Sequence, residues 1–177
     1  MKRLKLLKQK LRVYKTLSEA IGAMRSLSAH HFRLARKALP TSRIYREEVA
    51  RALAAVPFHW PRVPGAPTGF VVVSSDLGLC GEYNLALAQA AMTAVDEATL
   101  GRTRSVGPIY SVGRRARTIL AQANLIPRRL YPATTSVAGL TTLLLHLAEH
   151  LFDDFRAGEF GDLVVIYQSG AYGFTAS

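Results

Sequence analysis

The sequence predicts a protein of the α/β class, with a long N-terminal helix of the coiled-coil type followed by a parallel-sheet domain. Three observations support this prediction. Apolar residues recur at helical spacing at the start of the chain, a proline-rich segment follows, and strand-like and helix-like segments then alternate. We therefore divide the chain into a helix at 1–57, a joint at 58–68 and a β/α domain at 69–177, which we expect to be C-terminally incomplete.

The N-terminal helix is predicted from its apolar stripe. Large apolar residues stand three or four positions apart, so they lie on one side of an amphipathic helix. At a rise of about 1.5 Å per residue, such a helix is on the order of 80 Å long, more than a globular domain of this size needs. A stripe of this length favours a second helix packed along it. The stripe contains Leu4, Leu7, Leu11, Tyr14, Leu17, Ile21, Met24 and Leu27.

Two residues bear on the continuity of this helix. Gly22 lowers helix stability without ending a helix. Pro40 lacks an N–H and clashes with the preceding turn, so we expect a kink near Pro40. Helical spacing resumes at Ile44, with Ser42 as a candidate cap, and it ends by Pro57. The pattern leaves open one kinked helix or two helices in near register.

The positive charge of the chain is concentrated in this helix. Residues 1–57 hold 14 Lys and Arg against 3 Asp and Glu, which equals the net charge of +11 for the whole chain. The remainder is neutral and has its own apolar runs. A basic rod fits three classes of partner, namely nucleic acid, an anionic membrane and an acidic protein surface.

Several localisation signals can be weighed from composition. The single cysteine, Cys80, excludes an internal disulfide and favours a reducing compartment. A secretory signal is excluded because basic residues continue through Lys15, where an apolar segment should stand. The basic start matches a mitochondrial presequence in part, but its first serine is Ser18 and its stripe is uninterrupted. The apolar runs are too short for a transmembrane helix.

The second domain is predicted from alternating strand and helix patterns. A run of β-branched residues indicates a buried strand at 70–75, and we predict further short strands at 108–112, 128–131 and 162–167. Helical patterns lie at 84–99, at 114–124 and from Thr135 or Ser136 onwards. Residues 168–177 show no clear element. The third of these helices has a predicted inner face of Val137, Leu140, Leu144, Leu147, Leu151 and Phe155.

The segment from Ser74 to Asn84 is the most distinctive stretch. It reads as a strand-to-helix turn whose glycines, Gly78 and Gly81, allow backbone to approach a ligand. It lacks the glycine spacing of a dinucleotide site and the Lys-Ser/Thr pair of a P-loop. Cys80 could act as a nucleophile near a helix N-terminus, but no His or Asn is placed to serve it, so a structural role is favoured.

The same segment, Ser-Ser-Asp-Leu-Gly-Leu-Cys-Gly-Glu-Tyr-Asn, resembles a strand–turn–helix motif of the gamma subunit of F-type ATP synthases. Leu77 stands for the usual Arg, and Glu82 for the usual second Gly. The first helix is also similar to that family in its segments 11–15, 23–25 and 44–45. The order of basic helix, proline-rich joint and Rossmann-like domain matches as well.

The resemblance implies a rotor without catalytic residues, cofactor or metal. The first helix would wind around a last helix to form a shaft inside the alpha–beta hexamer, and the Rossmann-like domain would be a foot. That foot would meet the epsilon subunit and the c-ring of a proton- or sodium-translocating complex, with no nucleic acid bound. The expected place is the cytoplasmic face of the bacterial inner membrane, held peripherally, in preference to the mitochondrial matrix or chloroplast stroma. The implied subunit contacts are Lys15, Met24 and Arg25 on the helix and Asp76, Leu77, Cys80 and Glu82 on the turn.

Three departures from the family pattern bear on these expectations. Leu77 removes the guanidinium of a charged contact at the rim of the hexamer. His31 stands where a Lys is common. The last shaft helix of the family has no counterpart in the sequence, so transmission of torque by the family mechanism is not expected of these residues alone.

Two alternatives to the rotor remain. His146, Glu149 and His150 spell H-x-x-E-H, a zinc-hydrolase pattern in which Glu acts as base. The helical spacing places these three side chains away from the leucine stripe, toward solvent, with Glu159 or Asp162 as the remaining ligand candidates. The second alternative is a basic module for nucleic acid or anionic lipid, which would show a steep salt dependence of binding.

Overall fold

The structure of the chain is a computed structural model, and it divides into two compact units, Met1–His59 and Trp60–Ser177. Each unit is described by itself. The predicted joint at 58–68 falls mostly outside the described residues. The structure describes residues 2–56, 65–78, 80–99, 105–134, 136–169 and 173–176.

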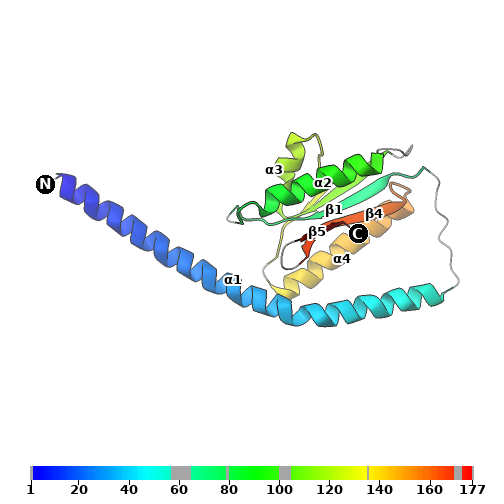
Figure 1. The fold of residues 1–177 in the computed structure, drawn as a ribbon, viewed down its shortest axis with the longest axis horizontal. Coiled ribbons are helices and arrows are strands. Elements are labelled where there is room, and N and C mark those ends of the chain that lie inside the picture. Colours follow the sequence, from blue (N-terminus) through cyan, green and yellow to red (C-terminus); the bar gives the residue numbers. More distant parts are fainter. Residues whose placement is uncertain are drawn as a thin grey trace. The chain divides into compact units, whose positions relative to one another are not determined.

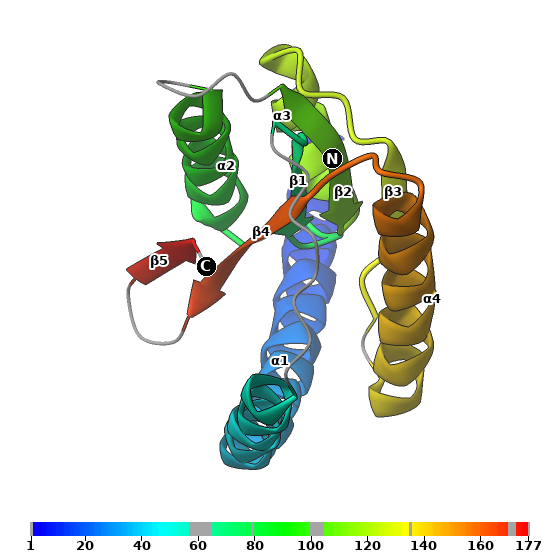
Figure 2. The ribbon, with the colours of Figure 1, turned by 90° about the vertical axis from the view of Figure 1, so that its right-hand side faces the viewer.

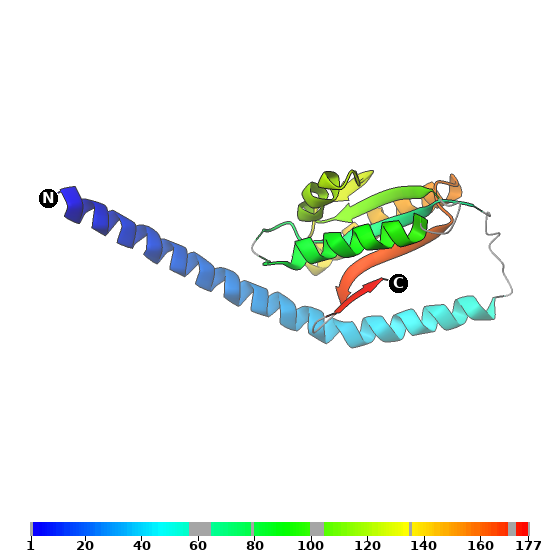
Figure 3. The same ribbon diagram turned by 45° about the horizontal axis from the view of Figure 1, so that its top comes forward.

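The first unit is one helix, α1, which runs from Lys2 to Ala55 and continues through Pro40. The sequence left one helix or two open, and the structure has one. It bends part-way along its length (Figures 1 and 3). Ser42 does not cap a second helix, because its hydroxyl lies within the helix and donates to the carbonyl of Ala38 at 3.2 Å. Proline inside a helix removes one backbone hydrogen bond, which is a common cause of such bends.

The apolar stripe of α1 is exposed within its unit. A soluble protein rarely leaves an apolar surface of this extent open to water, so the stripe marks an interaction surface. None of the described helices is both long enough and apolar enough to cross a membrane. The exposed large apolar residues of the stripe include Leu4, Leu7, Leu11, Tyr14, Leu17, Ile21, Met24, Leu27, Ile44 and Leu53.

The second unit is built on a five-stranded sheet with the order β3-β2-β1-β4-β5. The first four strands pair in parallel, as predicted, and β5 pairs antiparallel with β4. We predicted no clear element at residues 168–177, and β5 shows that this prediction was wrong. This strand is short and joins the sheet through backbone pairing. The strands are β1 Thr68–Val73, β2 Val106–Val112, β3 Arg129–Tyr131, β4 Asp162–Ser169 and β5 Gly173–Ala176.

Helices cover both faces of this sheet (Figure 2). The helices α2, Tyr83–Thr99, and α3, Arg114–Gln122, lie on one face. The helix α4, Val137–Arg156, lies on the opposite face. Its start is capped by the Ser136 hydroxyl, which accepts from the amide of Gly139 at 3.0 Å, as the sequence allowed.

Two apolar cores form on the two faces because successive strand residues point to opposite sides. In β1, Phe70 and Val72 pack under α2 and α3, whereas Val71 packs under α4. In β2, Ile109 joins the first core and Tyr110 joins the second. The β-branched run predicted as a buried strand thus contributes to two buried faces, as in other α/β sheets.

The predicted inner face of α4 was partly wrong. Leu147, Leu151 and Phe155 pack against the sheet as expected, and they are joined by Leu143. Leu140 and Leu144, which were also expected inward, are exposed. The apolar residues of α4 span more than one side of the helix, so periodicity alone did not fix which side meets the sheet.

Candidate functional site

The turn between β1 and α2 is fastened to the start of α3. The amide of Ser74 donates to the carbonyl of Val112 at 2.6 Å. The buried Ser74 hydroxyl lies 2.9 Å from the Val112 carbonyl and 3.0 Å from that of Gly113, and it accepts from the amide of Ala116 at 3.3 Å. The amide of Arg115 donates to the Ser75 carbonyl at 3.0 Å. Residues far apart in sequence are therefore held in one rigid corner.

Asp76 is committed to this internal attachment. Its Oδ1 accepts from the amide of Arg114 at 2.8 Å, so the carboxylate caps the first turn of α3. Its Oδ2 lies 3.8 Å from Nε of Arg114. The residue before α3 is Gly113, which has no side chain to do this. Asp76, predicted as a subunit contact, thus has a structural partner of its own.

The other polar groups of the turn also bond to one another. The Asn84 amide donates from Nδ2 to the Ser75 hydroxyl at 2.9 Å, and its Oδ1 accepts from the Ser75 amide at 3.1 Å. The Tyr83 hydroxyl donates to the carbonyl of Val73 at 3.0 Å. Burial, and then the charge of Cys80, raises the pKa of Tyr83. Because these groups are satisfied internally, the turn serves as a scaffold, and its chemistry does not resemble a phosphate cradle.

The outer surface of the turn carries the remaining predicted contacts. Leu77, Cys80 and Glu82 are all exposed, and Leu77 keeps 59% of its surface accessible. The Cys80 sulfur lies 3.5 Å from the Ser75 hydroxyl and 3.6 Å from the Leu77 carbonyl. Neither neighbour is a general base, which agrees with a non-catalytic cysteine. The structure therefore brings three of the four turn residues to a surface that a protein partner could reach.

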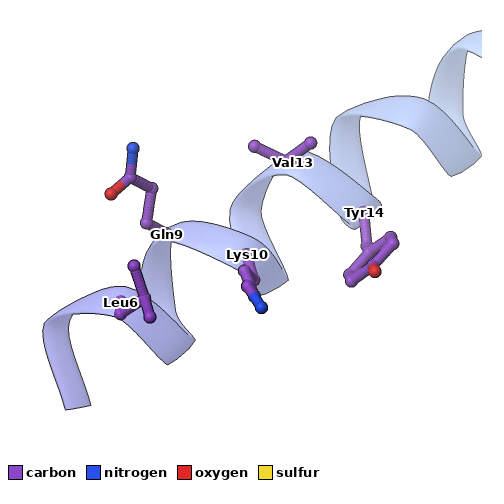
Figure 4. Close-up of a pocket in the computed structure, with 5 residues that line it drawn as sticks. All are labelled: Leu6, Gln9, Lys10, Val13 and Tyr14. Carbon is purple, nitrogen blue, oxygen red and sulfur yellow. The ribbon is translucent and has the colours of Figure 1, made fainter. Parts of the chain in front are cut away.

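Three further predicted contacts lie on α1. Lys15, Met24 and Arg25 are exposed, and Met24 belongs to the apolar stripe. A shallow hollow near the start of the same helix is lined by Leu6, Gln9, Lys10, Val13 and Tyr14 (Figure 4). Those five side chains leave a single helix, so the hollow has no opposing wall and does not form a ligand site.

The zinc motif does not assemble a metal site. His146 and Glu149 are exposed. His150 is half-buried, and its Nδ1 lies 2.7 Å from the Tyr131 hydroxyl, which corrects the expectation that it points to solvent. No group of three potential ligands occurs among the residues that the structure describes. Glu159, a candidate further ligand, instead forms an ion pair with Arg128 at 3.0 Å.

A buried polar cluster fastens α4 to the sheet. The Tyr110 hydroxyl donates to Oδ2 of Asp154 at 2.6 Å, and both residues are buried. Nη2 of Arg128 lies 3.5 Å from Oδ1 of Asp154. Burial, and then the hydrogen bond to Asp154, raises the pKa of Tyr110. Sequence reasoning missed this cluster because its members lie far apart in the chain.

Sequence reasoning also missed the first residues of α3. Arg114 and Arg115 lie against the turn, although they follow it by more than thirty positions. The one available signal was their position directly after a predicted strand, since the carboxyl ends of neighbouring parallel strands share one edge of a sheet.

Comparison with known proteins gives consistent results. A family model described as ATP synthase matches residues 3–172. A gamma chain of ATP synthase from Granulibacter bethesdensis is 32% identical over 182 residues, covering 93% of this chain and 58% of that protein. The gamma chain from Dictyoglomus thermophilum is 34% identical over 101 residues, covering 56% and 33%. The chain thus spans little more than half the length of the Granulibacter relative.

A solved structure shares the fold. The central stalk and c-ring structure of the Tetrahymena thermophila mitochondrial ATP synthase includes a chain that superposes with a TM-score of 0.52. The match covers 87% of this chain and 64% of that chain at 15% sequence identity. It supports the predicted α/β class with a long N-terminal helix, and nothing in the comparisons supports a zinc hydrolase or a nucleic-acid module. The resemblance seen in the sequence is confirmed, and the chain belongs to the family of ATP synthase gamma chains.

Proposed function

We propose that the chain acts as the central rotor subunit of an F-type ATP synthase, without catalytic residues of its own. The observation that carries the proposal is the family match over residues 3–172, which includes nearly all of the helix with the exposed apolar stripe. In this role the chain couples ion-driven rotation to ATP synthesis or hydrolysis in an alpha–beta hexamer. The coupling ion is a proton or sodium.

The partners follow from the two surfaces of the chain. The stripe of α1 pairs with a second helix to form the shaft, and its basic residues face the sleeve of the hexamer. Lys15, Met24 and Arg25 lie at that sleeve in our proposal. The foot domain meets the epsilon subunit and the c-ring, so the chain is held at the membrane through the complex. We place it at the cytoplasmic face of a bacterial inner membrane.

The physical support for the shaft is the cost of leaving the stripe in water. Burying apolar surface contributes about 25 cal/mol per Å², and each large side chain of the stripe contributes about 1.5–3 kcal/mol when fully buried. More than ten such side chains are exposed along α1. Their spacing of three and four residues fits a helical partner better than a flat lipid surface or a nucleic-acid groove.

Binding to the hexamer tests this function. The full chain, co-expressed with alpha and beta subunits from the same genome, should co-purify with them. Met24→Asp places a charge in the stripe and should weaken the association by about tenfold or more, because it buries an unpaired carboxylate. Met24→Leu keeps an apolar side chain of similar volume at the same position and is the matched control, expected to change the affinity less than twofold. Failure of the unaltered chain to associate, even with the family's last shaft helix supplied, would contradict the proposed function.

A further inference from the structure

The guanidinium of Arg115 lies directly on the turn that follows β1. A Cβ atom built at Gly78 would stand 2.9 Å from Nη2, 3.0 Å from Cζ and 3.3 Å from Nε of Arg115. Three atoms of the guanidinium are therefore about equally close to this one position, and they occupy the space that a side chain at Gly78 would fill. Because Gly78 has no side chain, the guanidinium of Arg115 on α3 can lie against the turn.

The attachment of the turn to α3 holds this charge in place. The Arg115 amide donates to the Ser75 carbonyl, and the Ala116 amide donates to the Ser74 hydroxyl. Asp76 caps the helix through the amide of Arg114. The backbone of Arg115 is thus fixed relative to Gly78, and a charge presented from a fixed backbone loses less entropy on binding than one on a free loop.

The charge of Arg115 is not neutralised within the part of the chain that the structure describes. The carboxylate of Asp76 on the turn is already paired, and its partner is Arg114. Glu82 is exposed, and no ion pair joins it to Arg115 among the described residues. Beside this cation stands Leu77, whose side chain is mostly exposed. Arginine is enriched among the residues that contribute most to protein–protein binding, so a fixed and unpaired guanidinium is a candidate protein contact.

We infer that Arg115 supplies the charged contact of this turn and docks a carboxylate on a protein subunit of the alpha–beta hexamer. This inference rests on the proposed function, since it concerns the same turn. Leu77 leaves the turn itself without a cation at its tip. Arg115 supplies a cation from the neighbouring helix α3 instead. Its planar guanidinium can bind both oxygens of a carboxylate. Leu77 then adds an apolar contact at the centre of the interface.

The first test reverses the charge. Arg115→Glu should weaken binding of the full chain to the hexamer by about tenfold or more, and it should reduce the dependence of affinity on salt. Arg117→Glu makes the same change of net charge at another exposed position of α3 and should alter affinity less than twofold. Equal binding by the unaltered chain and Arg115→Glu would overturn the inference while leaving the proposed function intact. Absence of binding by the unaltered chain would overturn both.

The second test moves the charge without removing it. Gly78→Ala places a methyl group where the guanidinium rests, and only the flexible end of Arg115 needs to shift. Binding should weaken about threefold to tenfold, a change of roughly 0.7–1.4 kcal/mol. In an Arg115→Ala background the same substitution should have no effect on affinity. Additive effects of the two substitutions would contradict the inference, as would a loss of binding to phosphatidylglycerol vesicles with hexamer binding unchanged.

Discussion

At the scale of single residues, the packing of the second unit, Trp60–Ser177, which we call the foot domain, depends on buried polar groups that pair with each other. Tyr110 is 0% exposed, yet it carries a hydroxyl, and the carboxylate of Asp154 on α4 satisfies this hydroxyl. A buried hydroxyl without a partner costs free energy, whereas a paired one contributes modestly. The pair therefore does more to specify where α4 sits on the sheet than to raise stability, since a shifted helix would leave both groups unsatisfied.

Asp154→Ala should destabilise the foot domain by about 1–3 kcal/mol, because it leaves the Tyr110 hydroxyl buried without an acceptor. The midpoint of urea denaturation measures this. Tyr110→Phe in the same background removes the orphaned hydroxyl and should restore part of the loss. A double-mutant cycle that shows additive losses would contradict the pairing of the two residues.

Alkaline pH should destabilise the foot domain through its buried tyrosines. Burial raises the pKa of Tyr110, Tyr131 and Tyr83 in the folded state. The unfolded chain releases these phenolic protons near pH 10, while the folded chain retains them, so the unfolded state binds fewer protons above that pH. Stability is thus complete below about pH 10 and falls as pH rises further, by up to about 1.4 kcal/mol per pH unit for each tyrosine.

Urea denaturation at pH 8, 10 and 11 provides the measurement. Tyr110→Phe should flatten the decline, because one of the groups responsible is absent. An unfolding free energy that stays constant between pH 8 and pH 11 would be inconsistent with buried, un-ionised tyrosines.

At the scale of elements, the contrast lies between a helix with few restraints and a sheet with many. Strand pairing fixes each strand of the foot to its neighbours, and the turn after β1 is fastened to α3 by backbone bonds. The helix α1 has only its own ladder of hydrogen bonds within its unit, and Pro40 interrupts that ladder. Local opening of α1 is therefore expected to begin around Pro40.

Pro40→Ala should slow amide hydrogen exchange around the middle of α1. The substitution restores a backbone donor and removes a clash worth about 3 kcal/mol in a helix interior, which corresponds to roughly a hundredfold change in the local opening equilibrium. Exchange followed by mass spectrometry over residues 36–44 measures it. Gly22→Ala in the same helix, where a Cβ meets no neighbour, is the control and should show a smaller effect, about 1 kcal/mol. Unchanged exchange in Pro40→Ala would contradict a weak point at Pro40.

At the scale of the whole molecule, charge and stability belong to different units. The first unit carries the basic excess and the open apolar stripe, while the second is neutral and buries its apolar residues in two cores. An acidic partner of the first unit thus gains apolar burial and is also attracted by the basic charge. The attraction between charges raises the rate of association more than the final affinity.

Much of this fold could be predicted because its signals are local and periodic. Helical spacing predicted α1, and short strand-like segments alternating with helical patterns predicted the four parallel strands. The inward side of α4 was predicted only in part, since apolar residues such as Leu144 also lie on its outer side. The strand β5, Gly-Phe-Thr-Ala, contains no apolar run from which a strand could be predicted.

The site was predicted less completely than the fold. The turn after β1 was found from its composition, and the family resemblance supplied its candidate role. The partners of its residues were not visible in the sequence, because Asp76 meets Arg114 and Gly78 meets Arg115 only after the strands align. The contact between Tyr131 and His150 was missed for the same reason.

The hydroxyl of Tyr110 has a consequence for how β2 can be aligned. Both faces of the sheet are apolar, so hydrophobic burial alone would tolerate a one-residue shift in the register of β2. In that misalignment the phenol would turn toward α2 and α3, where the core is built of alanines, leucines and other carbon-rich side chains. Asp154 would meanwhile lose its donor on the far side. The phenol oxygen of Tyr110 thus helps to make the two sides of this strand inequivalent, and it works against a one-residue register shift that hydrophobicity would permit.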